Sequence, residues 1–462
     1  MPCAWLARLT VALAAASAFG CGSGTPPTAA PGELCGARLR PARLSFDAAP
    51  EIETPESRLA VDIRVSTTRL ARELGARVPR VLAHAERVPV GTPGEASYRV
   101  ARGDFAVTLS GERLVVATPV SVSIAVCKPL GPICPSYGRC SAELAARASV
   151  PLVLDARYEL GASRVELATT RGCVLSPIGL DVTPELERTA RQQVAESKRR
   201  IDDSLPSLGP AIRAGWQLVQ TPVGLGNTPC ARISPERLAQ QRPSLESGTL
   251  VTRLAVFGHV GVEDPCPPPD AHPRERALPA PELRDDVPAG LALEVPVRLD
   301  WGDVSAALTR SLAAATRAGD ATRIVRAEAR GARLAGTSVV ALALTVEGDV
   351  CGEAWVTAEP WYDAARARVR LRRVALAPSQ PEASALELPA RVEESAEIAL
   401  PVELGAAPAA LEGLVKMLIS GAPESVAVDF QVEPPRVGRV LVAPQALVPL
   451  ASLRGRAVVA VK

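Results

Sequence analysis

The chain has few aromatic residues: phenylalanine, tryptophan and tyrosine make up only 3% of its 462 residues. Hydrophobic residues nevertheless reach 47% and charged residues 22%, which is the composition of a globular protein and not of a disordered chain. The hydrophobic cores must therefore consist mainly of leucine, valine and alanine. A chain of this length can bury sizeable cores and has room for two or three domains.

The chain also lacks a block of basic residues. Its 52 lysines and arginines nearly balance its 50 aspartates and glutamates, which leaves a net charge of +2. Nucleic-acid-binding proteins usually carry a clustered basic surface. We therefore expect no nucleic-acid partner.

Motifs of well-known catalytic centres are missing as well. The sequence contains no G-x-S-x-G, H-E-x-x-H or G-x-x-x-x-G-K-[ST] motif. The three histidines, His84, His259 and His272, are far apart in the chain. The acidic pairs 202–203 and 285–286 are adjacent residues, whose side chains diverge on a helix and do not converge on a substrate. We predict a protein that is not an enzyme and that uses no cofactor and no metal.

No hydrophobic run is long enough to cross a bilayer. The most apolar stretch is residues 9–19, which follow Arg8 at the N-terminus. A positive charge followed by a short apolar run is typical of an export signal. Residues 1–20 are therefore predicted to be a signal peptide.

The end of this signal resembles the lipobox of bacterial lipoproteins. Ala18 and Gly20 are small residues that precede Cys21, whose thiol would carry the lipid in that family. The match differs from the usual pattern at Ala18, where leucine is most common, and at the bulky Phe19. An ordinary secretory signal that is cut nearby is the alternative. The resemblance, with Gly22 instead of aspartate after the cysteine, implies an outer-membrane lipoprotein with a lipidated tether over residues 21–54.

Cysteine content agrees with export. Of ten cysteines, Cys3 lies in the signal and Cys21 would be lipidated. The other eight are Cys35, Cys127, Cys134, Cys140, Cys173, Cys230, Cys266 and Cys351. An even number in an exported chain predicts up to four disulfides, with at least one short-range bridge in the proline- and glycine-rich stretch 127–140. Zinc is the rival interpretation, but the spacing fits no zinc-finger pattern and no histidine lies nearby.

The stretch 59–75 changes its period halfway. Its first part alternates apolar and polar residues, which is typical of a half-buried strand, and its second part has apolar residues four apart, which is typical of a helix. The apolar positions are Leu59, Val61, Ile63 and Val65 in the strand and Leu70, Leu74 and Val78 in the helix. We therefore predict a strand that leads directly into an amphipathic helix.

The same pattern occurs a second time. Residues 59–78 align with residues 293–312 without a gap, and residues 109–127 resemble residues 334–351. Both members of the second pair contain a glycine turn, a strand pattern and a final cysteine. Two matches in the same order indicate a duplicated architecture, with the proline-rich stretch 264–290 as a linker between the copies.

The strongest helix prediction begins near residue 183. Thr183 suits the N-cap, Pro184 the first turn, and Glu185 the positive end of the helix dipole. Apolar residues then recur at spacings of three and four through Leu208. Residues 407–420 form a shorter counterpart in the second copy. Strands are predicted at residues 149–158, 163–169, 250–257, 367–375 and 426–432.

These features together resemble the tubular lipid-binding (TULIP) superfamily, the fold of bactericidal/permeability-increasing protein. More closely, the chain is similar to a bacterial lipoprotein family of unknown function assigned to that fold. The stretches that carry the resemblance are residues 59–79, residues 98–116, the helix from Pro184, and residues 213–225 with Trp216. The resemblance covers roughly residues 55 to 460.

The resemblance implies an α+β fold of two tandem elongated units, in which long antiparallel strands wrap around amphipathic helices. The units would span residues 55–263 and 291–462. Such folds enclose an elongated apolar cavity. Its lining would include Leu59, Val61, Ile63, Leu70, Leu74, Leu186, Val194 and Ile201. A packed core is the alternative role for each of these residues.

The expected function follows from this resemblance and from the predicted lipid anchor. We expect a cell-envelope protein, attached to the outer membrane and facing the periplasm or the cell surface, that binds or shuttles lipids or other hydrophobic ligands. The main alternative is a structural or partner-binding lipoprotein with solid cores. An enzyme that hydrolyses envelope polymers is a more distant alternative, because a pair of converging carboxylates cannot be recognised from sequence.

Overall fold

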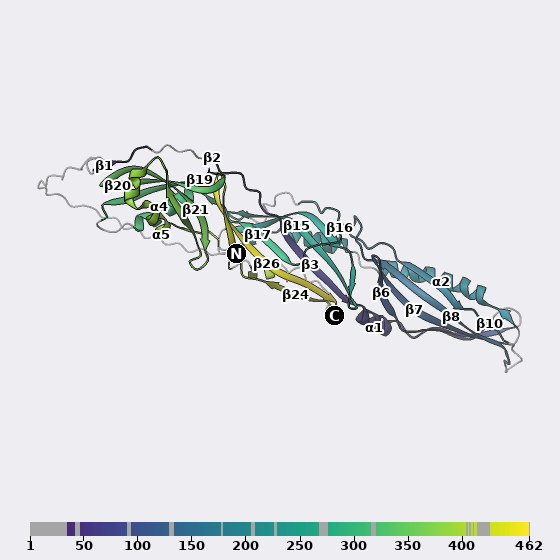
Figure 1. Cartoon of the computed structure of the whole chain (residues 1–462). Helices are drawn as coiled ribbons and strands as arrows, with labels where there is room; N and C mark the ends of the chain where they lie inside the picture. Colours follow the sequence, from purple (N-terminus) through teal and green to yellow (C-terminus); the bar gives the residue numbers. More distant parts are fainter. Residues whose placement is uncertain are drawn as a thin grey trace, which may run out of the picture.

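The computed structural model describes residues 35–41, 47–89, 94–128, 134–176, 179–204, 208–225, 229–267, 276–315, 320–402, 405, 408–409, 411–413 and 426–461. These residues form a long rod in which three β-sheets follow one another along the axis (Figure 1). We call them the N-terminal, central and C-terminal sheets.

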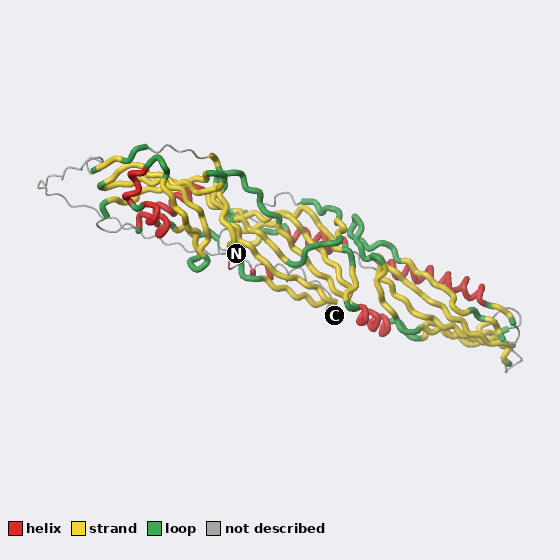
Figure 2. Tube along the Cα trace, viewed as in Figure 1, coloured by secondary structure: helices red, strands yellow, loops and turns green. Residues whose placement is uncertain are grey.

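The predicted α+β fold, with strands wrapped around helices, is wrong. Strands account for 55% of the described residues and helices for 19%, and the sheets are mainly antiparallel. The helices lie against the sheets (Figure 2). Helix α2 has 22 residues, but the other α-helices are short, with α1 and α4 spanning only 11 and 14 residues. Single strands run for up to 16 residues and are more numerous than the helices, so the strands dominate the described part of the fold.

The N-terminal sheet is antiparallel, with strand order β4-β5-β7-β8-β9 and β6 added beside β7. Its strands are β4 (Val81–Pro89), β5 (Glu95–Arg102), β6 (Ala106–Ser110), β7 (Arg113–Cys127), β8 (Ser136–Pro151) and β9 (Arg164–Arg171). Helix α2 (Thr183–Ser204) packs along β9, and α1 (Thr67–Arg77) contacts β6. A short pair, β10 (Val174–Leu175) and β11 (Leu180–Asp181), lies at the free end of the rod (Figure 1). This sheet with its helices and the short pair is the N-terminal unit.

The central sheet joins strands from both halves of the chain. Its main strands are β3 (Ser57–Ser66), β12 (Val223–Gly224), β13 (Cys230–Gln241), β15 (Thr249–Glu263), β17 (Leu291–Pro296), β18 (Leu299–Asp300) and β26 (Ala446–Val461). Shorter partners are β14 (Ser244–Glu246), β16 (Glu282–Arg284), β24 (Val426–Val432) and β25 (Arg436–Val442). Strand β3 pairs with β15 on one side and with β17 and β26 on the other. Helix α3 (Gly209–Val219) packs against β13.

The C-terminal sheet has the order β2-β19-β20-β21-β22-β23, with β1 beside β21. Its strands are β1 (Ala37–Arg38), β2 (Asp47–Ala48), β19 (Thr322–Leu334), β20 (Thr337–Gly348), β21 (Val350–Asp363), β22 (Arg368–Leu376) and β23 (Glu397–Ala399). Helix α4 (Trp301–Ala314) packs on β19, and α5 (Leu388–Ser395) packs on β22 after the 3-10 turn η1 (Pro381–Leu386). This sheet and these helices form the C-terminal unit.

The predicted strand-to-helix junction is confirmed. Strand β3 ends at Ser66, whose side chain accepts a hydrogen bond from the backbone N–H of Arg69 and so caps α1. Strand β18 also leads directly into α4; Asp300 is in an extended conformation at the N-cap but makes no side-chain capping hydrogen bond.

The predicted strand over residues 149–158 is wrong in its second half, because β8 ends at Pro151. The Asp155 carboxylate accepts hydrogen bonds from the backbone N–H groups of Arg157 and Glu159, which closes a turn. The side chain of Gln240, in the central sheet, binds the backbone just before Asp155. Its amide oxygen accepts a hydrogen bond from the N–H of Leu154 at 3.0 Å. The chain leaves β8 here to cross to the central sheet.

Candidate functional site

The two faces of the N-terminal sheet differ in chemistry. One face carries Val100, Val122 and Ala142, which belong to a core that includes Leu186 of α2. These three side chains share a face because they are opposite one another in the antiparallel register. The intervening residues must point to the other face, because side chains alternate along a strand. That second face is the one exposed to solvent.

The exposed face is hollowed into an open groove of about 1000 Å³. Strands β4, β5, β7 and β8 supply its lining. The lining residues are Val81, His84, Ala85, Glu86, Ser97, Tyr98, Arg99, Ser123, Ile124, Ala125, Arg139, Cys140 and Ser141. A volume of this size is at the upper end of the range typical of small-molecule sites.

Two cross-strand rows form the groove. One row is Ser97, Ala125 and Arg139, and the next is Arg99, Ser123 and Ser141. Serine and alanine are short, so the middle of the groove is low, while the long arginine side chains stand at opposite ends of the two rows. The hollow on this face therefore follows from the size of the side chains.

The serine hydroxyls already have hydrogen-bond partners. Ser97 accepts a hydrogen bond from the backbone N–H of Arg87, and Ser141 accepts one from Arg171 at 3.0 Å. Ser123 donates to the carbonyl oxygen of Arg99 at 3.5 Å. Only Ser123 uses its O–H as a donor in these bonds, whereas Ser97 and Ser141 accept and keep their O–H donors.

The two groove arginines differ from most of the other arginines that the structure describes. Among the described residues, the guanidinium groups of Arg99 and Arg139 have no hydrogen-bond or ion-pair partner. Nearby, Arg87 pairs with Glu95 at 2.7 Å and Arg171 pairs with Glu143 at 3.0 Å. An unpaired guanidinium presents a planar set of donors that suits phosphate and carboxylate groups. The groove therefore has two free sites for an anionic group, with Glu86 as the acidic residue on its border.

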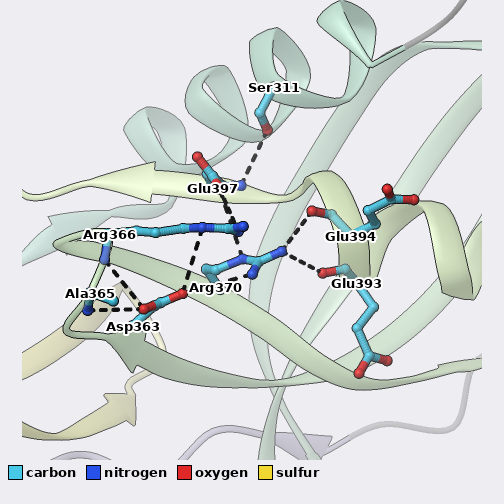
Figure 3. A network of polar contacts seen from close by, with 8 residues as sticks. All are labelled: Ser311, Asp363, Ala365, Arg366, Arg370, Glu393, Glu394 and Glu397. Carbon is cyan, nitrogen blue, oxygen red and sulfur yellow. Dashed lines mark hydrogen bonds and ion pairs between the residues drawn. The ribbon is translucent and has the colours of Figure 1, made fainter.

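A polar network in the C-terminal unit provides a contrast (Figure 3). Arg370 donates hydrogen bonds to the carbonyl oxygens of Glu393 and Glu394 at 3.1 and 2.6 Å, at the C-terminal end of α5. Its guanidinium also lies 3.8 Å from Asp363 and 3.9 Å from Glu397. The partners of Arg370 come from the protein itself, so this network holds a helix in place and offers no ligand site.

All eight cysteines predicted to pair do so. The bridges are Cys35–Cys351, Cys127–Cys134, Cys140–Cys173 and Cys230–Cys266. The predicted short-range bridge is Cys127–Cys134. Glu95 lies close to these two sulfur atoms. Because the sulfurs are bonded to each other, neither is a thiolate that could bind a metal.

The predicted apolar lining residues lie on separate elements. Leu59, Val61 and Ile63 are half-buried on β3 of the central sheet, and Leu70 and Leu74 are half-buried on α1. Leu186 packs on the covered face of the N-terminal sheet. None of these six residues borders the groove. Val194 and Ile201 belong to α2, but their side chains lie outside the described residues, as does the whole of Cys21.

Sequence reasoning missed the groove because it followed only apolar residues. The signal was present in residues 95–102 and 119–127, where small or charged residues alternate with valines. Polar residues at every second position of a strand indicate a face exposed to solvent. The small side chains of Ser97 and Ser123 leave a hollow on that face only when the strands pair side by side. No helix in the described part of the chain is long and apolar enough to span a membrane.

Comparison with known proteins identifies a family. A model described as domain of unknown function DUF4403 matches residues 55–461. The chain belongs to the DUF4403 family. The matched range includes the groove, the N-terminal and central sheets, all strands of the C-terminal sheet except β1 and β2, and three of the four disulfides, so these are features of the DUF4403 domain of this chain. No curated protein matches the chain.

Proposed function

We propose that this DUF4403 protein binds an anionic amphiphile, such as a lipid with a phosphate or carboxylate headgroup, and that it does so without catalysis. The observation that carries the proposal is the open groove with two unpartnered guanidinium groups, Arg99 and Arg139. A molecule that is part apolar and part anionic matches this lining.

The two parts of the ligand would be bound by different forces. Val81, Ala85 and Ala125 on the groove lining offer apolar contacts, and burial of an acyl chain is worth about 25 cal/mol per Å² removed from water. The guanidinium groups would provide charge-assisted hydrogen bonds to the headgroup. Glu86 would repel an anion placed at the β4 edge, which favours a headgroup on the side of Arg139.

The location is part of the same proposal. Export by residues 1–20 and lipidation of Cys21 would hold the protein in the cell envelope, on the outer membrane. The four disulfides support an oxidising compartment, because such bridges persist in exported proteins. The relationship to the tubular lipid-binding superfamily also remains part of this proposal.

Ligand retention tests the groove directly. A chain that starts at Gly32 keeps every described contact and has no anchor of its own. Native mass spectrometry and lipid extraction of this protein should detect a bound amphiphile. The Arg99→Ala/Arg139→Ala double variant should bind it at least about tenfold more weakly, because two charge-assisted contacts are lost.

Arg147→Ala is the matched control, since Arg147 is an exposed arginine on β8 outside the groove. It should retain the ligand as the unchanged chain does. If no amphiphile binds, or if the double variant binds as well as the control, the carrier function is refuted. The structural or partner-binding role is then the better account.

Lipidation has a separate test. Cys21→Ser, or treatment of cells with globomycin, should block maturation of the precursor. Normal maturation under either condition would contradict the lipoprotein assignment and favour an ordinary secretory signal.

A further inference from the structure

Two strands of the groove carry a set of hydrogen-bond donors around a low centre. We call this set the donor rectangle; it consists of Ser97, Arg99, Arg139 and Ser141. Strand β5 supplies the first two residues and β8 the other two. Within each strand they are two positions apart and in register across β7, so all four side chains share the exposed face. Strand β7 runs between them and contributes only the short side chains of Ser123 and Ala125 to this part of the face.

Each corner of the rectangle has donor groups that the protein leaves free. The two serines accept hydrogen bonds from other parts of the chain, and no acceptor for their own O–H groups lies among the described residues. The guanidinium groups of Arg99 and Arg139 are unpaired in the same part of the chain. A cluster of unused donors is satisfied by a ligand that is rich in acceptors.

The acidic residues around the rectangle are paired or lie outside it. On β5, Glu95 pairs with Arg87 at 2.7 Å. On β8, Glu143 pairs with Arg171 at 3.0 Å. Glu86 lines the groove from β4, the strand beyond β5. The rectangle itself therefore holds two positive charges and no negative charge.

The two arginines stand at diagonal corners of the rectangle. Arg99 and Arg139 are two strands and two residues apart, which separates their Cα atoms by about 12 Å. Each guanidinium ends a flexible stem of methylene groups, so both can lean over β7 and contact one group placed above Ser123 and Ala125. Without such a group, two like charges face each other across the hollow, and an anion between them relieves the repulsion.

We propose that the donor rectangle binds the terminal phosphate of a phosphomonoester. This inference rests on the proposed function, because it names the headgroup of the bound amphiphile. A phosphomonoester carries a charge of about −1.5 to −2 at neutral pH and three strong acceptor oxygens, which match two guanidinium groups and two hydroxyls. A carboxylate or a phosphodiester carries a single negative charge and would leave one guanidinium without a counter-charge.

Lysolipids with matched acyl chains test the choice of headgroup. The protein that starts at Gly32 should bind lysophosphatidate, a phosphomonoester, at least about tenfold more tightly than lysophosphatidylglycerol, a phosphodiester. Glycerol 3-phosphate has the same phosphate without an acyl chain and should bind more weakly than lysophosphatidate. Isothermal titration calorimetry below the micelle concentration of the lysolipids measures all three affinities.

Single arginine variants test the match of charge. Arg99→Ala and Arg139→Ala should each bind the two lysolipids equally, because one guanidinium remains and it matches one negative charge. Arg147→Ala should keep the preference for lysophosphatidate, since this exposed arginine of β8 lies outside the groove.

Serine variants test the hydroxyl donors. Ser97→Ala/Ser141→Ala should weaken the binding of lysophosphatidate about tenfold, because two hydrogen bonds to a charged group are lost. Ser121→Ala is the matched control, since Ser121 is an exposed serine on the same face of β7 but does not line the groove. It should bind as the unchanged protein does.

The possible outcomes separate this inference from the proposed function. Equal binding of the two lysolipids by the unchanged protein overturns the phosphomonoester and leaves an amphiphile carrier. If glycerol 3-phosphate binds as tightly as lysophosphatidate, the phosphate site is supported and the amphiphile is refuted. Binding of none of the three overturns both. A preference that Arg147→Ala abolishes as completely as Arg99→Ala does also overturns the donor rectangle.

Discussion

The N-terminal and C-terminal units differ in how they use their strands. Each has an antiparallel sheet with helices packed on it. In the C-terminal unit, β20 is buried on both faces from Val339 to Leu344. In the N-terminal unit, β7 buries only Val120 and Val122, on one face. The C-terminal unit therefore covers both faces of β20, whereas the N-terminal unit leaves one face of β7 exposed to solvent.

The amino-acid sequences of the two strands explain the difference. Both alternating sets of β20 are apolar, so each face of this strand needs a covering layer. In β7 one set is Val120 and Val122, and the other includes Ser121 and Ser123. Serine at every second position makes a solvent face, and its small volume leaves room for the groove. The comparison teaches that one alternating set of side chains decides whether a face of a strand is covered or exposed to solvent.

The first prediction concerns the helices of the two units. Leu308 of α4 is fully buried, whereas Leu186 of α2 is half-buried. Leu308→Ala should lower the free energy of unfolding by about 3–4 kcal/mol, because it leaves a cavity in a packed core. Leu186→Ala should cost about 1 kcal/mol, since less apolar area is lost. Urea unfolding followed by circular dichroism measures both, and equal losses would mean that the units are equally well packed.

The second prediction uses the disulfides of the N-terminal unit. Its small core leaves more of its stability to cross-links than to packing. Cys140→Ala/Cys173→Ala opens a bridge between residues 33 apart and should cost about 3 kcal/mol. Cys127→Ala/Cys134→Ala, at a separation of 7, should cost about 2 kcal/mol. Denaturant unfolding measures both losses. A larger loss for the shorter loop would contradict the explanation that the bridges act by restricting the unfolded chain.

The third prediction concerns the attachment of α5. Arg370→Met removes two hydrogen bonds to the end of this helix and should cost about 1–2 kcal/mol. Arg366→Met is the control, because that side chain is 54% exposed and its ion pairs contribute less than about 0.5 kcal/mol. Thermal unfolding compares the two variants. Similar effects would show that Arg370 acts only as a surface charge.

The smallest effect is expected in the pH dependence of α2. The Lys198 ammonium, followed by hydrogen bonds from Ser163, lowers the pKa of Asp202 from 3.8 to about 2. The carboxylate accepts a hydrogen bond from the N–H of Ser163 at 2.8 Å and so links α2 to the start of β9. A lowered pKa stabilises the folded state above the unfolded pKa, and this stabilisation is lost as the pH falls toward about 2.

Asp202→Asn should therefore reduce the unfolding temperature at neutral pH and make little difference near pH 2. The hydrogen bonds of Arg370 to the carbonyls of Glu393 and Glu394 have acceptors that do not titrate, so α5 should keep these two contacts in the same range. Thermal unfolding curves of the unchanged chain and of Asp202→Asn, recorded between about pH 5 and pH 2, measure the difference in stability. A constant difference across the range would exclude Asp202 as the origin of the effect.

Local features were predictable from the sequence, whereas the pairing of one strand with another was not. The change of period at residue 66, the helix from Thr183 and the pairing of eight cysteines all follow from spacing or number. Helical stripes drew attention to Leu70 and Leu186, but strands occupy more of the chain, which is why the α+β prediction failed. Residues 152–158 alternate like a strand, yet Asp155 closes a turn within them. The groove requires Ser97, Ser123 and Ser141 to meet across three strands, and no single strand shows that.

Hydrogen exchange with added ligand tests the central claim most directly. A lysophospholipid with an anionic headgroup should slow amide exchange in Glu95–Arg102 and Ser136–Pro151, the strands that carry Arg99 and Arg139. Exchange in Thr337–Gly348 of the C-terminal unit should not change. Protection confined to the C-terminal unit, or absent from both units, would contradict a binding groove on the N-terminal sheet.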